Sequence, residues 1–239
     1  MKILAVDTSS KNCSIAIVEF SDESSYKIIG LENSDNEKTH SQKLMPLVDK
    51  LFKETDLNLK DIDYLACCIG PGSFTGIRIG IATVKAFSDS LNMPIIPVTS
   101  LESLAYNVDF NGYVVPIIDA KNQNIYCEMF SAEDGRFINK SEPLAIDIDS
   151  IKEKIKLNEN KNICFVGDGS KIYEDKLRNI FSDNNVDFSD NNIQSAVSLA
   201  RCAYNKYLKG SYGDSSYISP LYLRKSQAER IADGEKKWI

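Results

Sequence analysis

The sequence predicts an α/β protein built from two similar halves. Segments with the apolar pattern of β-strands alternate along the chain with segments whose apolar residues recur at helical spacing. Two strand–turn–strand units, one at Asp7 and one at Asp119, form a weak twofold repeat. A glycine-rich run at 70–80 joins a predicted strand to a predicted helix. We therefore expect two domains, residues 1–106 and residues 107–239.

Within both halves, predicted strands and helices follow one another along the chain. In the first half the strands are 3–7, 13–20, 61–69 and 95–98, and the helices are 41–54, a segment from the glycine run to about residue 91, and a segment begun by Thr99 or Ser100. In the second half the strands are 114–119, 124–130 and 163–166, the helices are 150–156, 170–181 and 195–209, and the tail 217–224 is extended around Pro220. Thr39 or Ser41 can cap the helix at 41–54.

Composition excludes several classes of protein. With 43% hydrophobic and 26% charged residues over 239 residues, the chain has the makeup of a globular protein with a sizeable core. No apolar run approaches the ~18 residues of a membrane span. Asp7 also interrupts the first apolar segment, where a signal peptide would continue. We expect a cytoplasmic protein without membrane contacts.

Charge and side-chain chemistry narrow the functions further. The net charge is −6 and the basic residues form no stripe, which argues against nucleic-acid binding by the chain alone. The 6 cysteines show no CxxC spacing and are expected to be buried free thiols. The single histidine, His40, excludes a metal site made of two or three histidines within one chain. At the start of a helix, His40 is expected to be a capping or packing residue.

The turn Asp7-Thr8-Ser9 has two interpretations. Backbone N–H groups of such a turn can hold a phosphate while the carboxylate positions a metal or water. Alternatively, these residues are those that tight turns prefer. Because the turn lacks a glycine that would let a phosphate approach closely, we favour the structural interpretation.

The glycine run at 70–80 gives the sharpest signal. A strand, a glycine turn near Gly72 and Ser73, and a helix N-terminus form a geometry that can bind anions, although no Walker A sequence is present. In the helix, Gly76 and Gly80 lie on one stripe, where each glycine costs about 1 kcal/mol relative to alanine. We expect another helix to pack closely against them. Apolar side chains surround the rest of this helix, which is therefore either fully buried or half-buried in a partner.

The helix at 41–54 also carries a wide apolar arc. Such an arc indicates either a core helix or an exposed patch that binds another protein. The residues of the arc are Leu44, Leu47 and Leu51 on one side and Met45, Val48 and Phe52 on the other.

Two further motifs have both a functional and a structural interpretation. Asp119 ends a strand, where a catalytic carboxylate or an ordinary turn residue can stand. The run 167–170, Gly-Asp-Gly-Ser, can flank an adenine or a phosphate, or can be a βα turn with Ser170 as N-cap.

Several short motifs, in this order, resemble the TsaB (YeaZ) family. The long glycine-centred run is the most specific of them, and together they span nearly the whole chain. They are residues 3–9, 39–42, 70–80, 98–102, 119–121 before Ile125-Tyr126, 166–169 and 220–224. Lys121 differs from the arginine common in the family, keeping the charge but losing the bidentate fork.

The resemblance implies an actin/Hsp70-like ATPase (ASKHA) fold, with two subdomains that each have a mixed five-stranded sheet and flanking helices. The last helix and tail are expected to pack back on the first subdomain. It further implies a non-catalytic scaffold subunit in the synthesis of N6-threonylcarbamoyladenosine at position 37 of tRNAs that read ANN codons. The chain would bind and activate the catalytic subunit TsaD, recruit the ATPase TsaE, and contact tRNA only through the complex.

In such a subunit, ATP and metal act through the partners and no cofactor binds this chain. The first two helices are expected to contact TsaD, and to form a homodimer when the chain is alone. The candidate interface residues are Leu44, Leu47, Val48, Leu51, Gly76, Ile77, Gly80, Ile81 and Val84. The candidate nucleotide or phosphate vicinity is Asp7, Thr8, Ser9, Gly72, Ser73, Asp119, Gly167 and Gly169.

The alternative function is a stand-alone kinase or ATPase of the same fold, with Asp7 or Asp119 as base and a nucleotide between the subdomains. The missing glycine in the Asp7 turn argues against this alternative. A metalloprotease is excluded by the single histidine.

Overall fold

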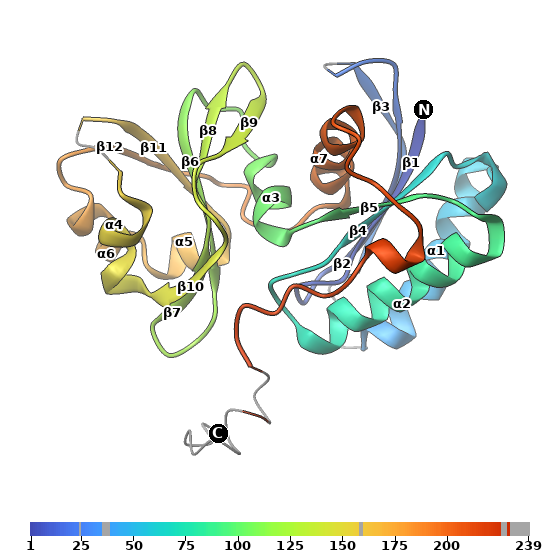
Figure 1. Cartoon of the computed structure of the whole chain (residues 1–239), viewed down its shortest axis with the longest axis horizontal. Helices are drawn as coiled ribbons and strands as arrows, with labels where there is room; N and C mark the ends of the chain where they lie inside the picture. The colour runs from blue at the N-terminus through green and yellow to red at the C-terminus, as the bar shows by residue number, and fades with distance from the viewer. Residues whose placement is uncertain (24, 35–38, 158–159, 226–228, 230–239) are drawn as a thin grey trace.

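The computed structural model describes residues 1–23, 25–34, 39–157, 160–225 and 229. They form two lobes that lie side by side, with a helix from near the end of the chain standing between them (Figure 1). In this part of the chain no helix is long and apolar enough to cross a membrane.

The first lobe is a mixed sheet whose described strands are ordered β3-β2-β1-β4-β5. The strands are β1 (Lys2–Asp7), β2 (Cys13–Phe20), β3 (Tyr26–Ser34), β4 (Tyr64–Cys68) and β5 (Ile95–Val98). β1 pairs antiparallel with β2 and parallel with β4. Both faces of this sheet are covered, as the continuous apolar runs predict.

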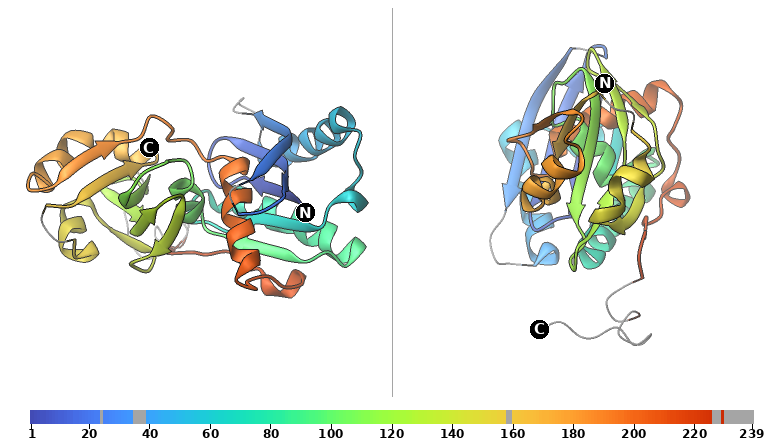
Figure 2. Two further views of the ribbon diagram at one scale, coloured as in Figure 1. Left: turned by 90° about the horizontal axis from the view of Figure 1, so that it is seen from above. Right: turned by 90° about the vertical axis from the view of Figure 1, so that its left-hand side faces the viewer.

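Alternate residues of β1 enter different cores. Leu4 and Val6 pack with helices α1 (His40–Thr55) and α2 (Phe74–Leu91). Ile3 and Ala5 face the opposite side, where α7 (Ala196–Leu208) packs. Because side chains alternate along a strand, β1 packs against α1 and α2 on one face and against α7 on the other. Figure 2 shows α7 lying across the first sheet at the boundary with the second lobe.

The sheet of the second lobe repeats the arrangement of parallel and antiparallel strands seen in the first lobe. The described path is β10-β7-β6-β11-β12, with β8 and β9 joined at the side of β6. Its strands are β6 (Gly112–Asp119), β7 (Asn124–Cys127), β8 (Phe130–Glu133), β9 (Arg136–Asn139), β10 (Leu144–Asp147), β11 (Asn162–Val166) and β12 (Asn185–Phe188). β6 pairs antiparallel with β7 and parallel with β11, as β1 does with β2 and β4. The predicted α/β class and the twofold repeat are confirmed.

Short helices connect these strands. They are α3 (Ser100–Ala105), α4 (Ile151–Ile155), α5 (Asp168–Ile172) and α6 (Glu174–Ile180), with 3-10 turns η1 (Leu59–Asp61), η2 (Ile148–Ser150) and η3 (Ser215–Tyr217). Thr99 is the N-cap of α3, as predicted, and Thr39 rather than Ser41 is the N-cap of α1.

Several predicted elements are corrected. The strand predicted at 61–69 is shorter, because η1 precedes it. The strand predicted at 124–130 is interrupted at Glu128 and Met129, so that β7 and β8 pair separately with β6. The helix predicted at 170–181 divides at Tyr173 into α5 and α6. Strands β3, β9, β10 and β12 were not predicted.

The lobes share one apolar core. Leu101 of α3, Phe130 of β8 and Leu199 of α7 belong to the same cluster. The rings of Tyr106 and Phe137 lie 4.5 Å apart between their centroids. The tail after α7 returns along the first lobe, where Gly213 bridges to Ile95.

Candidate functional site

The Asp7 turn is closed on itself and buried. Asp7 Oδ1 accepts hydrogen bonds from the backbone N of Ser9 at 2.9 Å and from Ser9 Oγ at 2.7 Å. Asp7, Thr8 and Ser9 are 0%, 1% and 3% exposed. The N–H of Ser9, which a bound phosphate would need, is therefore already engaged by the carboxylate of its own turn.

The first turns of α2 cover this loop. Thr8 Oγ1 donates to the carbonyl oxygen of Gly76 at 2.7 Å, and the backbone N of Ser73 donates to the carbonyl oxygen of Ser9 at 2.7 Å. A Cβ on Gly76 would overlap the carbonyl oxygen of Thr8, and a Cβ on Gly80 would overlap Thr8 Oγ1. The glycine stripe of α2 thus packs on the Asp7 turn. This corrects the expectation that the glycines face another helix.

Gly72 fits the same arrangement. Its φ is +158°, and a Cβ there would overlap the carbonyl oxygen of Ser9. Gly72 and Ser73 therefore lie against the Asp7 turn, as the candidate phosphate vicinity requires. The carbonyl oxygen of Ser9 lies directly against the backbone of Gly72.

Asp7 and His40 each keep one polar atom without a partner. Asp7 Oδ2 and His40 Nδ1 are buried and accept or donate no hydrogen bond. Burial raises the pKa of Asp7 above its ordinary value, although the bonds from Ser9 oppose this. Burial lowers the pKa of His40. His40 is the first residue of α1, with its ring beside Gly76, which agrees with a packing residue.

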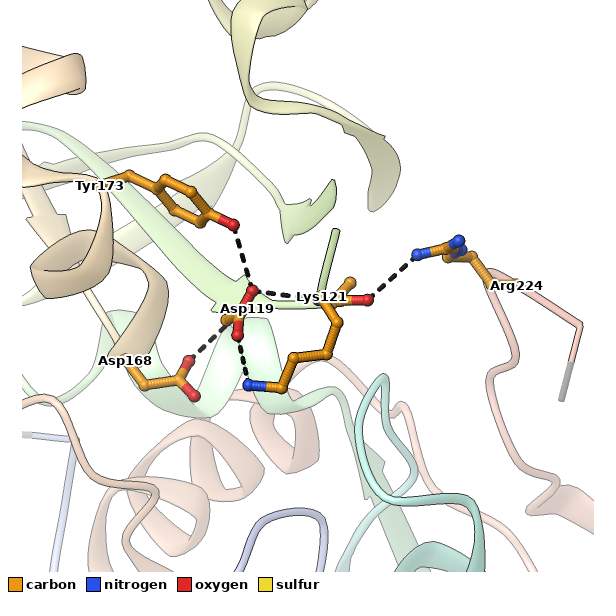
Figure 3. Close-up of polar contacts among 6 residues, drawn as sticks. Asp119, Lys121, Asp168, Tyr173 and Arg224 are labelled. Carbon is orange, nitrogen blue, oxygen red and sulfur yellow. Dashed lines mark hydrogen bonds and ion pairs between the residues drawn. The ribbon is translucent and has the colours of Figure 1, made fainter. Parts of the chain in front are cut away.

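Asp119 forms a second, separate cluster at the end of β6 (Figure 3). Its carboxylate pairs with Lys121 Nζ at 2.6 Å and accepts from Tyr173 Oη at 3.3 Å. Its backbone N donates to Asp168 Oδ1 at 3.1 Å. The Asp119 side chain is 6% exposed, so these partners nearly enclose it. Tyr173 was not predicted, because it stands where one continuous helix was expected.

Gly167 and Gly169 hold α5 against this strand end. Gly167 has φ +106°, and a Cβ there would overlap the carbonyl oxygen of Ile117. A Cβ on Gly169 would lie 3.1 Å from the backbone N of Asp119. Burial raises the pKa of Asp168, the residue between them. In both lobes, therefore, glycines allow a helix to pack closely against the end of a strand that terminates in an aspartate.

The residues predicted at the partner interface belong mainly to the core of the first lobe. All are buried between the helices and the sheet except Leu47, which is partly buried: Leu44, Val48, Leu51, Gly76, Ile77, Gly80, Ile81 and Val84. The apolar side chains already pack against their own sheet and the two glycines lie against the Asp7 turn, so the residue-level prediction is corrected.

The outward faces of the two helices carry other residues. On α2, Ala82 and Ala86 are exposed and Ile79 and Thr83 partly so, and the same face carries the exposed Arg78 and Asp89. On α1, Met45 is 49% exposed.

The tail adds contacts that were not predicted. Tyr222 stacks on Phe74 with ring centroids 4.5 Å apart, and Arg78 Nε donates to its hydroxyl at 2.7 Å. Arg224 Nη1 donates to the carbonyl oxygen of Ala120 at 3.1 Å (Figure 3). An open pocket of about 410 Å³ beside the start of α2 is lined by Phe74, Arg78, Tyr222 and Arg224, among others. The motif 220–224 thus connects the first lobe to the turn after Asp119.

Metal ligands do not gather anywhere in the described ranges: no group of three or more His, Cys, Asp or Glu side chains could hold a metal ion there. The 6 cysteines are all free and buried, as predicted.

Comparisons with known proteins agree across nearly the whole chain. The family model described as TsaD: tRNA N6-adenosine threonylcarbamoyltransferase matches residues 21–232. The tRNA threonylcarbamoyladenosine biosynthesis protein TsaB of Bacillus subtilis (strain 168) is 28% identical over 100% of this chain and 98% of its own. The protein of the same name from Buchnera aphidicola subsp. Schizaphis graminum is 33% identical over 71% of this chain and 79% of its own.

A solved structure shares the fold. YeaZ from Pseudomonas aeruginosa superposes with a TM-score of 0.76 at 23% identity, covering 93% of this chain and 99% of its own. Together with the repeated sheet order, this confirms the predicted α/β fold of two subdomains, each with a mixed sheet and flanking helices. The prediction of five strands in each sheet is corrected for the second lobe, where β8 and β9 bring the described sheet to 7 strands.

Proposed function

The chain belongs to the TsaB (YeaZ) branch of the TsaD family, and on that premise we propose that it serves the synthesis of N6-threonylcarbamoyladenosine in tRNA as a non-catalytic scaffold subunit. In this proposal the chain binds and activates TsaD and recruits TsaE to the junction between the chain and TsaD. It contacts tRNA only within the complex. ATP and metal act on the partner subunits.

The observation that carries the proposal is the closed Asp7 turn. A phosphotransferase needs backbone N–H groups and a carboxylate open to a nucleotide and its metal. Here the N–H of Ser9 and the carboxylate of Asp7 bond each other, and α2 lies on the turn through Gly76. A stand-alone kinase or ATPase would have to move α2 before a phosphate could enter.

Two small exposed residues on the outward face of α2 support partner binding. Ala82 and Ala86 are small, so another helix can approach closely between the charged side chains of Arg78 and Asp89. Met45 adds an exposed apolar side chain on the neighbouring helix α1. We propose that TsaD covers this face, and that a second copy of the chain covers it when TsaD is absent.

Depletion of the chain from cells tests the function. The level of threonylcarbamoyladenosine in tRNA digests, measured by mass spectrometry, should fall, and an Asp7→Asn, Asp119→Asn double variant should restore it. Loss of the nucleoside that only the intact carboxylates restore would favour a catalytic chain. An unchanged level would overturn the proposed pathway.

Charge on the outward face of α2 tests the interface. Ala82→Glu should abolish co-purification with TsaD and leave the chain folded, because the site is exposed. Ile172→Glu, on α5 of the second lobe and 56% exposed, is the matched control and should co-purify normally. Equal recovery of TsaD with both variants would place the interface elsewhere.

A further inference from the structure

Glu128 is a buried carboxylate between β7 and β8, whose residues Tyr126 and Phe130 share one apolar cluster with α3 and α7. It stands at the interruption between β7 and β8 and is 1% exposed. Its Oε1 accepts a hydrogen bond from Asn139 Nδ2 at 2.6 Å. Its Oε2 is buried and has no hydrogen-bond partner. A charged carboxylate with one such oxygen carries a large desolvation cost.

Lys206, a cation that acts on Glu128, is paired with another carboxylate. Lys206 Nζ, on α7, bonds both carboxylate oxygens of Glu102, on α3, at 2.8 and 2.9 Å. Glu102 also accepts from the backbone N of Thr99 at 2.8 Å, so it is fixed in place. Glu128 therefore faces a neutral ion pair whose negative member repels it.

The charged and titratable groups that act on Glu128 come from every element packed around it. They are Glu102 of α3, Lys206 and Cys202 of α7, and Glu142 before β10, with the Asn139 amide of β9 as hydrogen-bond donor. Burial first, and Glu102 next, raise the pKa of Glu128 to about 8, against the lowering effects of Asn139 and Lys206. At neutral pH the side chain holds a proton.

We propose that Glu128 is a proton-controlled joint between the lobes: while neutral it lets β7 and β8 pack on α3 and α7, and when it ionises it loosens that packing. The joint is a property of the chain itself and does not depend on the proposed function. Its effect is a contact between lobes that weakens as the solution becomes alkaline.

The sign follows from proton linkage. An unfolded glutamate titrates near 4.5, whereas folded Glu128 titrates near 8. Between these values the folded state holds the extra proton, so raising the pH favours unfolding. The stabilisation is complete below the lower value and is lost as pH rises through the upper one. One such group changes the unfolding equilibrium by up to about tenfold per pH unit.

Urea unfolding of the full chain from pH 5 to pH 9 tests the linkage. Relative to Glu128→Gln, wild type should become less stable with pH, by up to about tenfold per unit between pH 5 and 8. Glu142→Gln, an exposed acid beside the same site, is the matched control and should keep the wild-type slope. Equal slopes for wild type and Glu128→Gln would overturn the proposal.

Two measurements on wild type keep the proposal testable if Glu128→Gln does not fold. Carbon NMR of chains labelled at glutamate carboxyls should show a glutamate that titrates above pH 7. Hydrogen exchange, corrected for its intrinsic pH dependence, should accelerate at α3, α7 and β8 above pH 8 and stay unchanged at β1. Ordinary titration of every glutamate, or acceleration spread evenly over both lobes, would contradict the joint.

Discussion

The hydroxyl of Thr8 donates a 2.7 Å hydrogen bond to the carbonyl oxygen of Gly76, so the first strand–turn–strand unit and the glycine helix α2 form one unit. The contact requires the two backbones to lie closer than a side chain at position 76 would permit. The glycines that weaken α2 as an isolated helix are therefore the residues that let it pack.

Gly76→Ala should lower the free energy of unfolding by about 2 kcal/mol, because the new Cβ overlaps the carbonyl oxygen of Thr8. Chemical denaturation measures this change. Helix propensity alone predicts the opposite sign, a gain of about 1 kcal/mol. Ala82→Gly on the exposed face is the comparison and should cost about 1 kcal/mol. A more stable Gly76→Ala would show that α2 does not press on the turn.

Asp7→Asn should flatten the dependence of stability on pH. Burial raises the pKa of Asp7 in the folded chain, so its stabilising neutral form is lost as the pH rises from the ordinary aspartate value through the raised one. Asparagine keeps an oxygen for the two bonds from Ser9 and carries no charge. Urea unfolding at pH 4 to 7 compares the slopes. Parallel curves for the two proteins would mean that Asp7 titrates normally.

Substitutions of Lys206 and Glu102 should have strongly non-additive effects on the free energy of unfolding. Lys206→Met leaves Glu102 without its cation, and we expect a loss of about 2 kcal/mol in unfolding free energy. Adding Glu102→Gln to that variant should recover part of the loss, because no charge is then left unpaired. Thermal and urea unfolding of the double-mutant cycle measure the coupling, and additive losses would show that the two charges act independently.

Tyr222 should separate ring stacking from hydrogen bonding. Tyr222→Phe keeps the stack on Phe74 and removes the bond from Arg78, at a cost of about 0.5–1 kcal/mol. Tyr222→Ala removes both and should cost about 1–2 kcal/mol. Denaturation curves of the two variants give the comparison. If both variants are as stable as wild type, the contact between the tail and α2 does not stabilise the fold.

Strong periodic segments were predictable, whereas edge strands were not. β2 was predicted with the limits the structure gives, because each face of that strand meets an apolar layer. β3 lies at the sheet edge with most of its residues exposed or partly exposed, so its sequence has no clear alternation. β12 is a short edge strand of the same kind.

The two Asp turns could be located from the sequence, but the contacts that their residues make could not. The turns at Asp7 and Asp119 and the glycines around them were recognised from local spacing. Which surface each glycine meets depends on how distant segments pack, and Gly76 meets Thr8 across 68 positions of sequence. Glu128 gave no local signal, because its burial depends on α3 and α7 arriving from elsewhere in the chain.

The position of α7 constrains the order in which a newly made chain can acquire structure. β1, near the start of the sequence, packs one face against this helix, which is synthesised almost two hundred residues later. Strands β6 to β12 and the helices between them are complete by then. During translation the second lobe can thus fold while this apolar face of the first lobe is still uncovered. A chain that terminates before α7 leaves that face uncovered, as a target for chaperones or proteases.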